Sequence, residues 1–367
     1  MPTFRSDLET LKPYVAGKPI SEVARELGLD DIIKLGSNEH PAPPVPAAIE
    51  AISRVAREVN RYPDNSYHEL TLAIANRYDT TADHVWVGAG SSDILNCTAR
   101  AAAGPGTSIV YANPSFVLYK IVITLAGSEP IEVPVDGHWG HDLDAMLEAV
   151  RDDTTIVFVC NPNNPTGTYV GKSALANFID SVDDSVLVVV DEAYAEYATA
   201  DDFESCIDLA LIRDNVIVTR TFSKIFGLAG LRVGYAIGTP ETLRQLRKAQ
   251  PPFVVNVTAE AAAVAALADL DEIERRKTAN AIERAAVIEA LNSRGIRHAD
   301  SQTNFVFLDL DLDTDAADLA DALLRRGVIV RRLGDHLRIT VGTHEENVRC
   351  MKALDEAVAD IAETTNR

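Results

Sequence analysis

Short apolar runs alternate with helical patterns through the middle of the chain, from about residue 84 to residue 235. The runs are rich in valine and isoleucine: HVWVGAG, SIVYANP, PIEVPV, TIVFVCNP, SVLVVVDEAY, VIVTRTFS and RVGYAIG. Between them lie stretches such as SSDILNCTARAAA and KSALANFIDSV, which open with residues suited to a helix start. Continuously apolar strands separated by helices indicate a sheet covered on both faces. The pattern predicts an α/β fold with a large domain around a mostly parallel seven-stranded sheet.

The pattern changes after PPFVVNVT, where one long amphipathic helix is expected over about residues 259–294. The apolar run TNFVFLDL follows, then a helix over about 314–326, the strands GVIVRRL and HLRITVG, and a terminal helix. This order predicts a smaller α+β domain. We expect a large domain over 31–258 and a small one made of an N-terminal arm, 1–30, and residues 259–367.

The charge balance argues against nucleic acids and membranes as partners. The chain has 34 basic and 55 acidic residues, a formal charge of -21 and a pI near 4.7. Such a surface repels phosphate backbones and anionic lipids, although the same acidity is also typical of proteins from salty habitats. The start MPTFRSDLET has no apolar segment, and the run VLVVV is too short to cross a bilayer. We therefore expect a cytoplasmic protein.

Cysteine and histidine spacing gives no metal site. The cysteines form no C-x-x-C pair, so neither a zinc site nor a disulfide framework is predicted, and they fit a reducing compartment. They are Cys97, Cys160, Cys206 and Cys350. His138 and His141, in HWGH, lie near Gly137, which favours a solvated turn over a metal site.

Polar residues follow several of the apolar runs, and in a parallel sheet this is where ligands bind. After HVWV comes GAGSSD, whose small residues allow an anion to approach a helix start. After TIVFVC comes NPNNPTG, a turn that orients the amides of Asn163 and Asn164. Asp191 follows SVLVVV, and a carboxylate there needs a backbone amide or a cationic ligand atom as partner. The strand VIVTR leads to Lys224.

Phe116 follows SIVYANP, where an aromatic ring can stack on a flat ligand or belong to the core. A lysine, a buried carboxylate, an anion cup and an aromatic ring together match the needs of pyridoxal phosphate. That cofactor requires an amine for its Schiff base, a carboxylate on its ring nitrogen, a phosphate cup and a ring clamp. The sequence therefore predicts pyridoxal phosphate as the cofactor and no metal.

These residues lie in motifs that resemble those of the fold-type I pyridoxal-phosphate aminotransferases, closest to the histidinol-phosphate aminotransferase branch. The resemblance runs nearly end to end through the following motifs: LKPYVAGKPI, KLGSNEHPAPP, RYPD, GAGSSDIL, NPSFVLY, NPNNPTGT, DEAYAEY, RTFSKIFGLAGLRVGY, TNFVF and LRITVGT. It implies a PLP-dependent enzyme of class I/II whose large domain binds the cofactor.

On the cofactor side, the resemblance implies that Lys224 forms the Schiff base and then moves the proton between Cα and C4′. Asp191 would hold the ring nitrogen, Asn164 and Tyr194 the phenolic oxygen, and Phe116 the ring face. The implied phosphate cup consists of Gly90, Ser91, Ser92, Thr221, Ser223 and Arg232.

The resemblance also implies a homodimer with shared active sites, because Tyr62, in RYPD, would reach the phosphate bound by the neighbouring subunit. On the substrate side, Arg338 would receive an anionic group and Arg331 would contact a substrate phosphate. Tyr14 would close over that phosphate, and Asn38 would also face the substrate.

The implied reaction is histidinol phosphate plus 2-oxoglutarate giving imidazole acetol phosphate plus glutamate, a step of histidine biosynthesis. Two departures from the family leave the substrate open. RRLGDH is short and places Asp335 near the anion site, where the doubled Arg331 and Arg332 are expected to offset part of its negative charge, and His40 stands where asparagine or tyrosine is common. Alternatives on the same fold are an aromatic amino acid aminotransferase and a decarboxylase of threonine-phosphate type.

Two further alternatives belong to other classes. A non-enzymatic scaffold is disfavoured because it has no need for a buried lysine opposite a buried carboxylate. A nicotinamide-binding protein is disfavoured because GAGSSD lacks the full G-x-G-x-x-G pattern.

Overall fold

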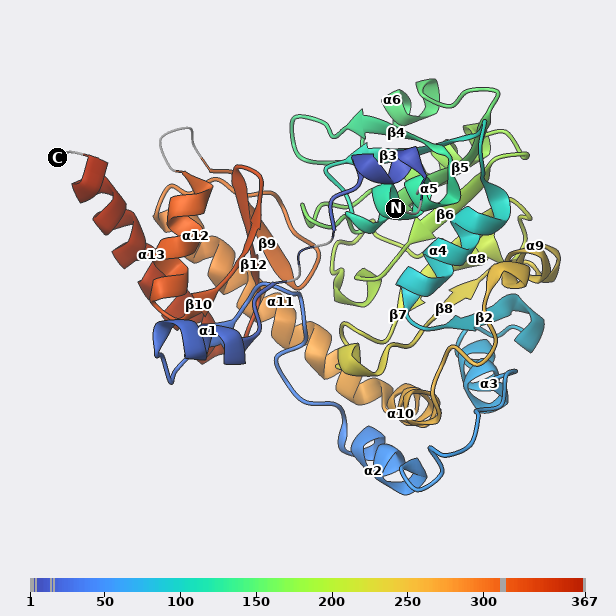
Figure 1. Ribbon diagram of the computed structural model, residues 1–367, viewed down its shortest axis with the longest axis horizontal. Coiled ribbons are helices and arrows are strands. Elements are labelled where there is room, and N and C mark those ends of the chain that lie inside the picture. Colours follow the sequence, from blue (N-terminus) through green and yellow to red (C-terminus); the bar gives the residue numbers. More distant parts are fainter. Residues whose placement is uncertain (1–2, 4, 14, 16, 311–314, 366–367) are drawn as a thin grey trace.

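The computed structural model describes residues 3, 5–13, 15, 17–310 and 315–365. Figure 1 shows two regions of different architecture. The large region runs from α2 to α10, residues 46–267, and the small region comprises residues 20–34, 305–310 and 315–365. A long helix, α11 (Leu270–Ser293), links them.

A seven-stranded sheet with the order β2-β8-β7-β6-β5-β3-β4 forms the centre of the large region. Its strands are β2 (Val85–Gly88), β3 (Ser108–Asn113), β4 (Glu129–Pro134), β5 (Thr154–Cys160), β6 (Leu187–Asp191), β7 (Val216–Thr221) and β8 (Gly234–Ile237). Only β8 runs antiparallel to its neighbours. The predicted mostly parallel seven-stranded sheet and the α/β fold class are confirmed.

Helices cover both faces of this sheet. They are α2 (Pro46–Val55), α3 (His68–Arg77), α4 (Ser91–Ala102), α5 (Leu118–Ala126), α6 (Leu143–Glu148), α7 (Lys172–Ser181), α8 (Ile207–Ala210), α9 (Pro240–Leu246) and α10 (Val257–Leu267). One face packs Val188 and Val190 of β6 against α3, α7 and α10, and the other packs Val189 against α4, α5 and α9. Both faces of each central strand are buried, which explains the unbroken apolar runs.

The small region contains a three-stranded antiparallel sheet with the order β11-β12-β9. Its strands are β9 (Phe305–Leu308), β11 (Arg331–Leu333) and β12 (His336–Thr340). Helices α1 (Ile20–Leu27), α12 (Ala316–Arg325) and α13 (His344–Thr365) accompany it, and β1 (Ile33–Lys34) pairs in parallel with β10 (Val328–Ile329). Ile33 and Leu35 pack in the core of the small region, although the predicted boundary at residue 30 assigns them to the large domain. The division into domains itself stays a prediction.

The single long helix expected over 259–294 is wrong, because α10 ends at Leu267 and α11 begins at Leu270. The carboxylate of Asp269 accepts a hydrogen bond from the backbone N–H of Glu272, which caps the start of α11. Ile273 then packs in the large core and Leu291 in the small one, so α11 belongs to both.

The loop that contains HWGH is only partly the expected solvated turn. The carboxylate of Asp136 accepts from the N–H groups of His138 and Gly140, as in a turn. His141, however, is buried, and burial lowers the pKa of its ring to about 4. The ring of Trp139 packs against Phe307 of the small region, 5.0 Å between centroids. The loop therefore touches both regions.

All four cysteines are buried and free. Burial raises the pKa of the Cys97, Cys160 and Cys350 thiols to about 12, and that of Cys206 also rises. Among the described residues, no three histidine, cysteine, aspartate or glutamate side chains are grouped to hold a metal. No described helix is long and apolar enough to cross a membrane.

Candidate active site

A cavity of about 360 Å³ lies where the carboxyl ends of β5, β6 and β7 meet the small region. Most of the residues predicted from the sequence to form a site line this cavity: Asn38, Ser91, Ser92, Phe116, Asn164, Asp191, Tyr194, Thr221, Ser223, Lys224, Arg232, Arg331 and Arg338. The parallel strands end at one edge of the sheet, which brings these side chains together.

Asp191, the last residue of β6, forms part of the buried floor of the cavity and is 1% exposed. The hydroxyl of Tyr119 donates to its Oδ2 at 3.0 Å, and that of Thr219 donates to its Oδ1 at 3.2 Å. Burial raises the pKa of Asp191 to about 6, although both hydrogen bonds lower it. Since these hydroxyls and the backbone N–H of Ala193, which also lowers the pKa, are neutral, a cationic ligand atom would favour the ionised carboxylate.

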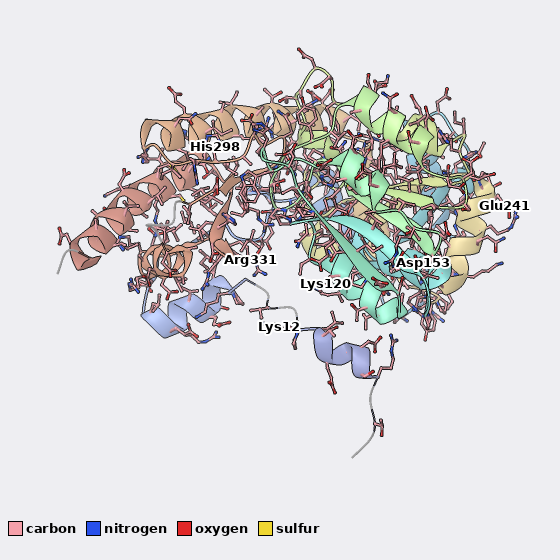
Figure 2. The ribbon with its side chains drawn as sticks, turned by 90° about the horizontal axis from the view of Figure 1, so that it is seen from above. Lys12, Lys120, Asp153, Glu241, His298 and Arg331 are labelled. Carbon is pink, nitrogen blue, oxygen red and sulfur yellow. The ribbon has the colours of Figure 1, made fainter. Side chains whose placement is uncertain are left out.

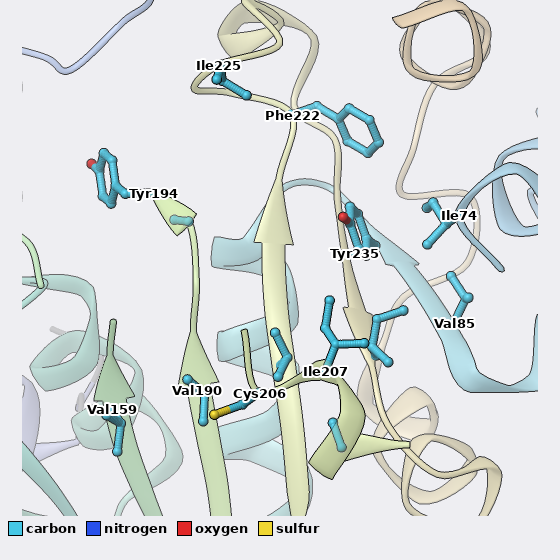
Figure 3. Close-up of a cluster of buried hydrophobic side chains, with 14 of the residues drawn as sticks. Ile74, Val85, Val159, Val190, Tyr194, Cys206, Ile207, Phe222, Ile225 and Tyr235 are labelled. Carbon is cyan, nitrogen blue, oxygen red and sulfur yellow. The ribbon is translucent and has the colours of Figure 1, made fainter. Parts of the chain in front are cut away.

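Lys224 lies in the turn after β7, held in place by apolar neighbours. Phe222, Ile225 and Phe226 are fully buried, and Figure 3 shows Phe222 and Ile225 beyond the end of the strands. The backbone N–H of Gly227 bonds to the carbonyl of Lys224 at 2.9 Å, which closes the turn. The lysine side chain faces the cavity, with Nζ 5.3 Å from the centroid of the Tyr194 ring.

A candidate anion site lies at the start of α4. Gly90 precedes this helix with φ +85, and a Cβ added there would lie 2.7 Å from Nη2 of Arg232. Nη1 of Arg232 donates to Oγ of Ser223 at 3.1 Å and to the carbonyl of Ala229 at 2.9 Å. A helix start, several hydroxyls and a guanidinium around one space suit a phosphate dianion. Gly90 contributes space rather than a lining side chain.

Tyr194 and Asn164 connect the floor of the cavity to the small region. The amide of Asn38 donates to the Tyr194 hydroxyl at 3.0 Å, and burial raises the pKa of that hydroxyl to about 12. Figure 3 shows the hydroxyl of Tyr194 directed away from Phe222 and Tyr235. Arg338 donates through Nη1 to Oδ1 of Asn164.

Arg331 and Arg338 face each other across the β11–β12 hairpin. They are paired in the antiparallel register, so their side chains share one face of the sheet, and both line the cavity. Figure 2 shows Arg331 at the boundary between the two regions. Arg332 alternates to the other face, is exposed, and does not line the cavity. The expectation that Arg332 offsets the charge of Asp335 at the anion site is therefore wrong, and Asp335 does not line the cavity either.

Phe116 lines the cavity with its ring edge-on to Tyr119, 5.8 Å between centroids. Tyr62 does not line this cavity; it is 82% exposed and stacks on Phe253 with centroids 4.8 Å apart. Its expected role in a neighbouring subunit stays a prediction. Tyr14 lies outside the described residues.

Several residues that line or support the site were not predicted from the sequence. Tyr119 and Thr219 bind Asp191, and the only signal for Thr219 was its position two residues before Thr221, on the same face of the strand. In segment 36–39 the resemblance implied only Asn38; Gly36, Ser37 and Glu39 had no local signal, because the segment meets β12 from the other end of the chain. The further lining residues include Gly17, Gly36, Ser37, Glu39, Ser115 and Cys160.

The chain matches the family model described as "Aminotransferase class I and II" over residues 30–354. It is 41% identical to the histidinol-phosphate aminotransferase of Moorella thermoacetica over 368 residues, which covers 98% of this chain and 94% of that protein. It is 44% identical to histidinol-phosphate aminotransferase 1 of Cupriavidus pinatubonensis over 361 residues, covering 96% and 95%.

Two solved structures extend the comparison. Histidinol-phosphate aminotransferase from Sinorhizobium meliloti, in complex with pyridoxal-5′-phosphate, superposes with a TM-score of 0.91 at 28% identity and covers 98% of this chain and 99% of that one. Aspartate aminotransferase from Thermus thermophilus superposes with a TM-score of 0.83 at 24% identity, covering 98% and 100%. The second likeness shows the fold alone.

Proposed function

The chain belongs to the class I and II aminotransferases, and from this premise we propose that it binds pyridoxal phosphate and moves an amino group between histidinol phosphate and 2-oxoglutarate. The products are imidazole acetol phosphate and glutamate. The observation that carries the proposal is a single cavity that contains Lys224, a buried carboxylate, an anion cup and two facing arginines.

The cavity fits the cofactor in its chemistry as well as in its residues. Asp191 is a buried carboxylate that accepts hydrogen bonds from neutral groups, and it would hold the protonated ring nitrogen. Arg232 and the start of α4 would hold the phosphate, Phe116 the ring face, and Asn164 with Tyr194 the phenolic oxygen. When bound, pyridoxal phosphate supplies an electron sink for the carbon that carries the amine.

Lys224 would hold the cofactor covalently and then act as the general base at the substrate. Its Nζ takes the proton from the Cα of the substrate. Tyr194 is 3% exposed, and its ring lies beside Nζ of Lys224, so it helps to exclude water from this position. Arg338 and Arg331 would bind the anionic groups of the two substrates, a phosphate or a carboxylate, through paired hydrogen bonds.

A homodimer with shared active sites belongs to the same proposal. Tyr62 is exposed next to Phe253, and Ile49 of α2 and Val59 are also exposed large apolar residues of the large region. A second copy that covers this surface would bring Tyr62 to the phosphate cup of its partner. The expected cytoplasmic location stays a prediction.

Substrate assays in parallel test the proposal. The purified protein, with pyridoxal phosphate added, is given 2-oxoglutarate and either histidinol phosphate, phenylalanine or threonine phosphate, and glutamate formation and CO₂ release are measured. We expect the highest kcat/KM for glutamate formation with histidinol phosphate. Faster glutamate formation with phenylalanine, or CO₂ release from threonine phosphate, would replace the proposed substrate. A protein that never becomes yellow with pyridoxal phosphate would refute the cofactor assignment.

A further inference from the structure

Three charged side chains are buried together behind the candidate active site. Glu192, Arg220 and Glu196 have side-chain exposures of 0%, 7% and 6%. Side chains alternate along β7, so Arg220 lies on the face of the sheet opposite Thr219, and Glu192, the residue after β6, is bound to Arg220 there. None of the three lines the cavity, and the proposed function gives them no role.

The guanidinium of Arg220 binds both carboxylates. Its Nε donates to Oε2 of Glu192 at 2.9 Å, and its Nη1 donates to Oε1 of Glu196 at 2.7 Å. The other oxygen of Glu192 accepts from the backbone N–H of Cys206 at 2.7 Å, and Oγ of Ser205 donates to Oε2 at the same distance. The cluster therefore joins β6, β7 and the segment before α8.

This arrangement brackets Tyr194. Glu192 precedes Tyr194 by two residues and Glu196 follows it by two. The guanidinium of Arg220 is therefore hydrogen-bonded to the turn on both sides of Tyr194. Figure 3 shows Tyr194 beyond the end of the strand that carries Val190. Arg220 also directly precedes Thr221 of the anion cup and lies four residues before Lys224.

A buried ion cluster of this kind is a weak source of net stability. Burial alone would lower the pKa of Arg220, but Glu192 and Glu196 raise it well above its usual value, so the cation persists. Desolvation of the three charges offsets most of their attraction, and apolar replacements of buried ion pairs are often neutral or stabilising. The cluster also fixes the relative orientation of the segments that carry the two carboxylates, because a guanidinium binds both at fixed angles.

We propose that Arg220, held between Glu192 and Glu196, is a positioning residue. It sets the distance and angle between Asp191 and Tyr194, at the end of β6 and in the turn after it, and Thr221 and Lys224, at the end of β7 and in the turn after it. It touches neither substrate nor cofactor and acts through the backbone of these neighbours. Ring and phosphate contacts of one cofactor come from two different strands, so their mutual placement decides how well both are made. The inference rests on the proposed function, since it concerns pyridoxal phosphate.

The first test is Arg220→Lys, which keeps the charge but cannot bind both carboxylates in the same geometry. We expect the dissociation constant of pyridoxal phosphate, measured by titrating cofactor-free protein, to rise about tenfold. The pH midpoint of the visible absorbance of the bound cofactor should rise by about one unit, because a displaced Tyr194 hydroxyl stabilises the deprotonated form less. Asp191, Lys224 and Arg338, the charged groups around Tyr194, remain in place.

Two further variants keep the test decisive. Arg213→Lys makes the same exchange in an ion pair with the exposed Asp180, and it should change neither quantity. Glu196→Gln keeps an oxygen for Arg220 and should raise the dissociation constant about threefold; it decides the matter if Arg220→Lys does not fold.

Thermal midpoints of the cofactor-free proteins separate positioning from stability. If Arg220→Lys and Glu196→Gln melt at lower temperature but bind the cofactor with the wild-type constant and pH midpoint, the cluster is only structural and the inference is wrong. If the wild-type protein itself does not bind pyridoxal phosphate, the proposed function fails first and the inference fails with it.

Discussion

The two ends of the cavity are built in different ways. At the cofactor end, Asp191 ends β6 and Lys224 lies in the turn after the neighbouring strand β7, and Asp191 is hydrogen-bonded to Thr219 of β7. At the substrate end, Nη2 of Arg338 donates to the carbonyl of Gly36 at 3.1 Å, across 302 positions of the chain. The first end belongs to one sheet, whereas the second exists only where segment 36–39 meets the small region.

This difference separates the two tasks of the site. The large-region core fixes the cofactor end, so we expect cofactor binding to tolerate changes in the small region. Arg331 and Arg338 lie on a hairpin of the small region, so substrate affinity should depend on how that region packs. The expected effects below test this separation, beginning with the largest.

Lys224→Ala should nearly abolish amino transfer at the cofactor end. Both the covalent attachment and the general base are lost, so kcat/KM should fall by at least about 10³-fold in a glutamate-coupled assay. Lys248→Ala, an exposed lysine on the same region, is the matched control and should retain full activity. A Lys224→Ala protein with the wild-type rate would remove the centre of the proposed mechanism.

Arg338→Lys should weaken the substrate end while sparing the cofactor end. A lysine cannot form paired hydrogen bonds to a carboxylate or phosphate, and Arg338 is 8% exposed, so kcat/KM should fall by about 10²-fold. The dissociation constant of pyridoxal phosphate should change by no more than about threefold, since Asn164 remains. Arg332→Lys, on the other face of the hairpin, is the control. Equal losses in cofactor and substrate binding would break the proposed separation.

Acidification should weaken the cofactor end through Asp191. Without cofactor, burial raises the pKa of this carboxyl from its ordinary value of 3.8 to about 6. The free energy of unfolding therefore falls as the pH rises from about 4 to about 6, because the unfolded chain ionises this group more easily than the folded one. A cationic ring nitrogen favours the ionised form. Below pH 6, Asp191 must release a proton when pyridoxal phosphate binds, so the affinity for the cofactor should fall by up to about tenfold for each unit by which the pH is lowered.

Titrations of pyridoxal phosphate between pH 4.5 and 8 measure this dependence. The cofactor phosphate also titrates with a pKa of about 6, so the relevant quantity is the difference in slope between the wild-type protein and Asp191→Asn. The variant should bind more weakly with a shallower pH dependence. Parallel slopes would show that Asp191 is not the group that titrates.

Arg331→Ala should have the smallest effect of these variants, and the size of its effect on KM should depend on the substrate. Arg331 is only half-buried at the rim, so its loss should raise KM by about five- to tenfold for a phosphorylated substrate and by less than about twofold for phenylalanine. Arg332→Ala provides the control for the loss of a neighbouring charge. Equal changes with both substrates would mean that Arg331 does not recognise a phosphate.

The cofactor end could be predicted from the sequence because each of its parts is local. Asp191 directly follows an apolar run, Lys224 lies in a turn after another, and GAGSSD opens a helix, so strand order alone brings them to one edge. Tyr119 could not be found in this way, because its contact with Asp191 depends on how α5 packs across the strand ends. Its position three residues after Phe116 gave no periodic signal that separates it from a core residue.

The substrate end could be predicted only in part. The resemblance implied Arg331 and Arg338, but the doubled arginine did not show that Arg332 lies on the opposite face, because a three-residue strand is too short to leave a visible alternation. The pairing of β1 with β10 rests on two residues in each strand, too few to leave a pattern. The break between α10 and α11 could not be predicted either, since alanine-rich and glutamate-rich segments both favour helices and Asp269 was the only sign of a new start.

The four buried thiols are natural probes of local unfolding, because they lie in different parts of the molecule. Cys97 lies on α4, Cys160 at the end of β5, Cys206 before α8, and Cys350 on α13, and their raised pKa values suppress reaction with electrophiles while the protein is closed. Under pulse labelling with a thiol reagent, each cysteine becomes modified only when its surroundings unfold transiently. The modification rate of Cys350 relative to that of Cys160 therefore measures how independently the small region unfolds from the large one, and no engineered probe is needed.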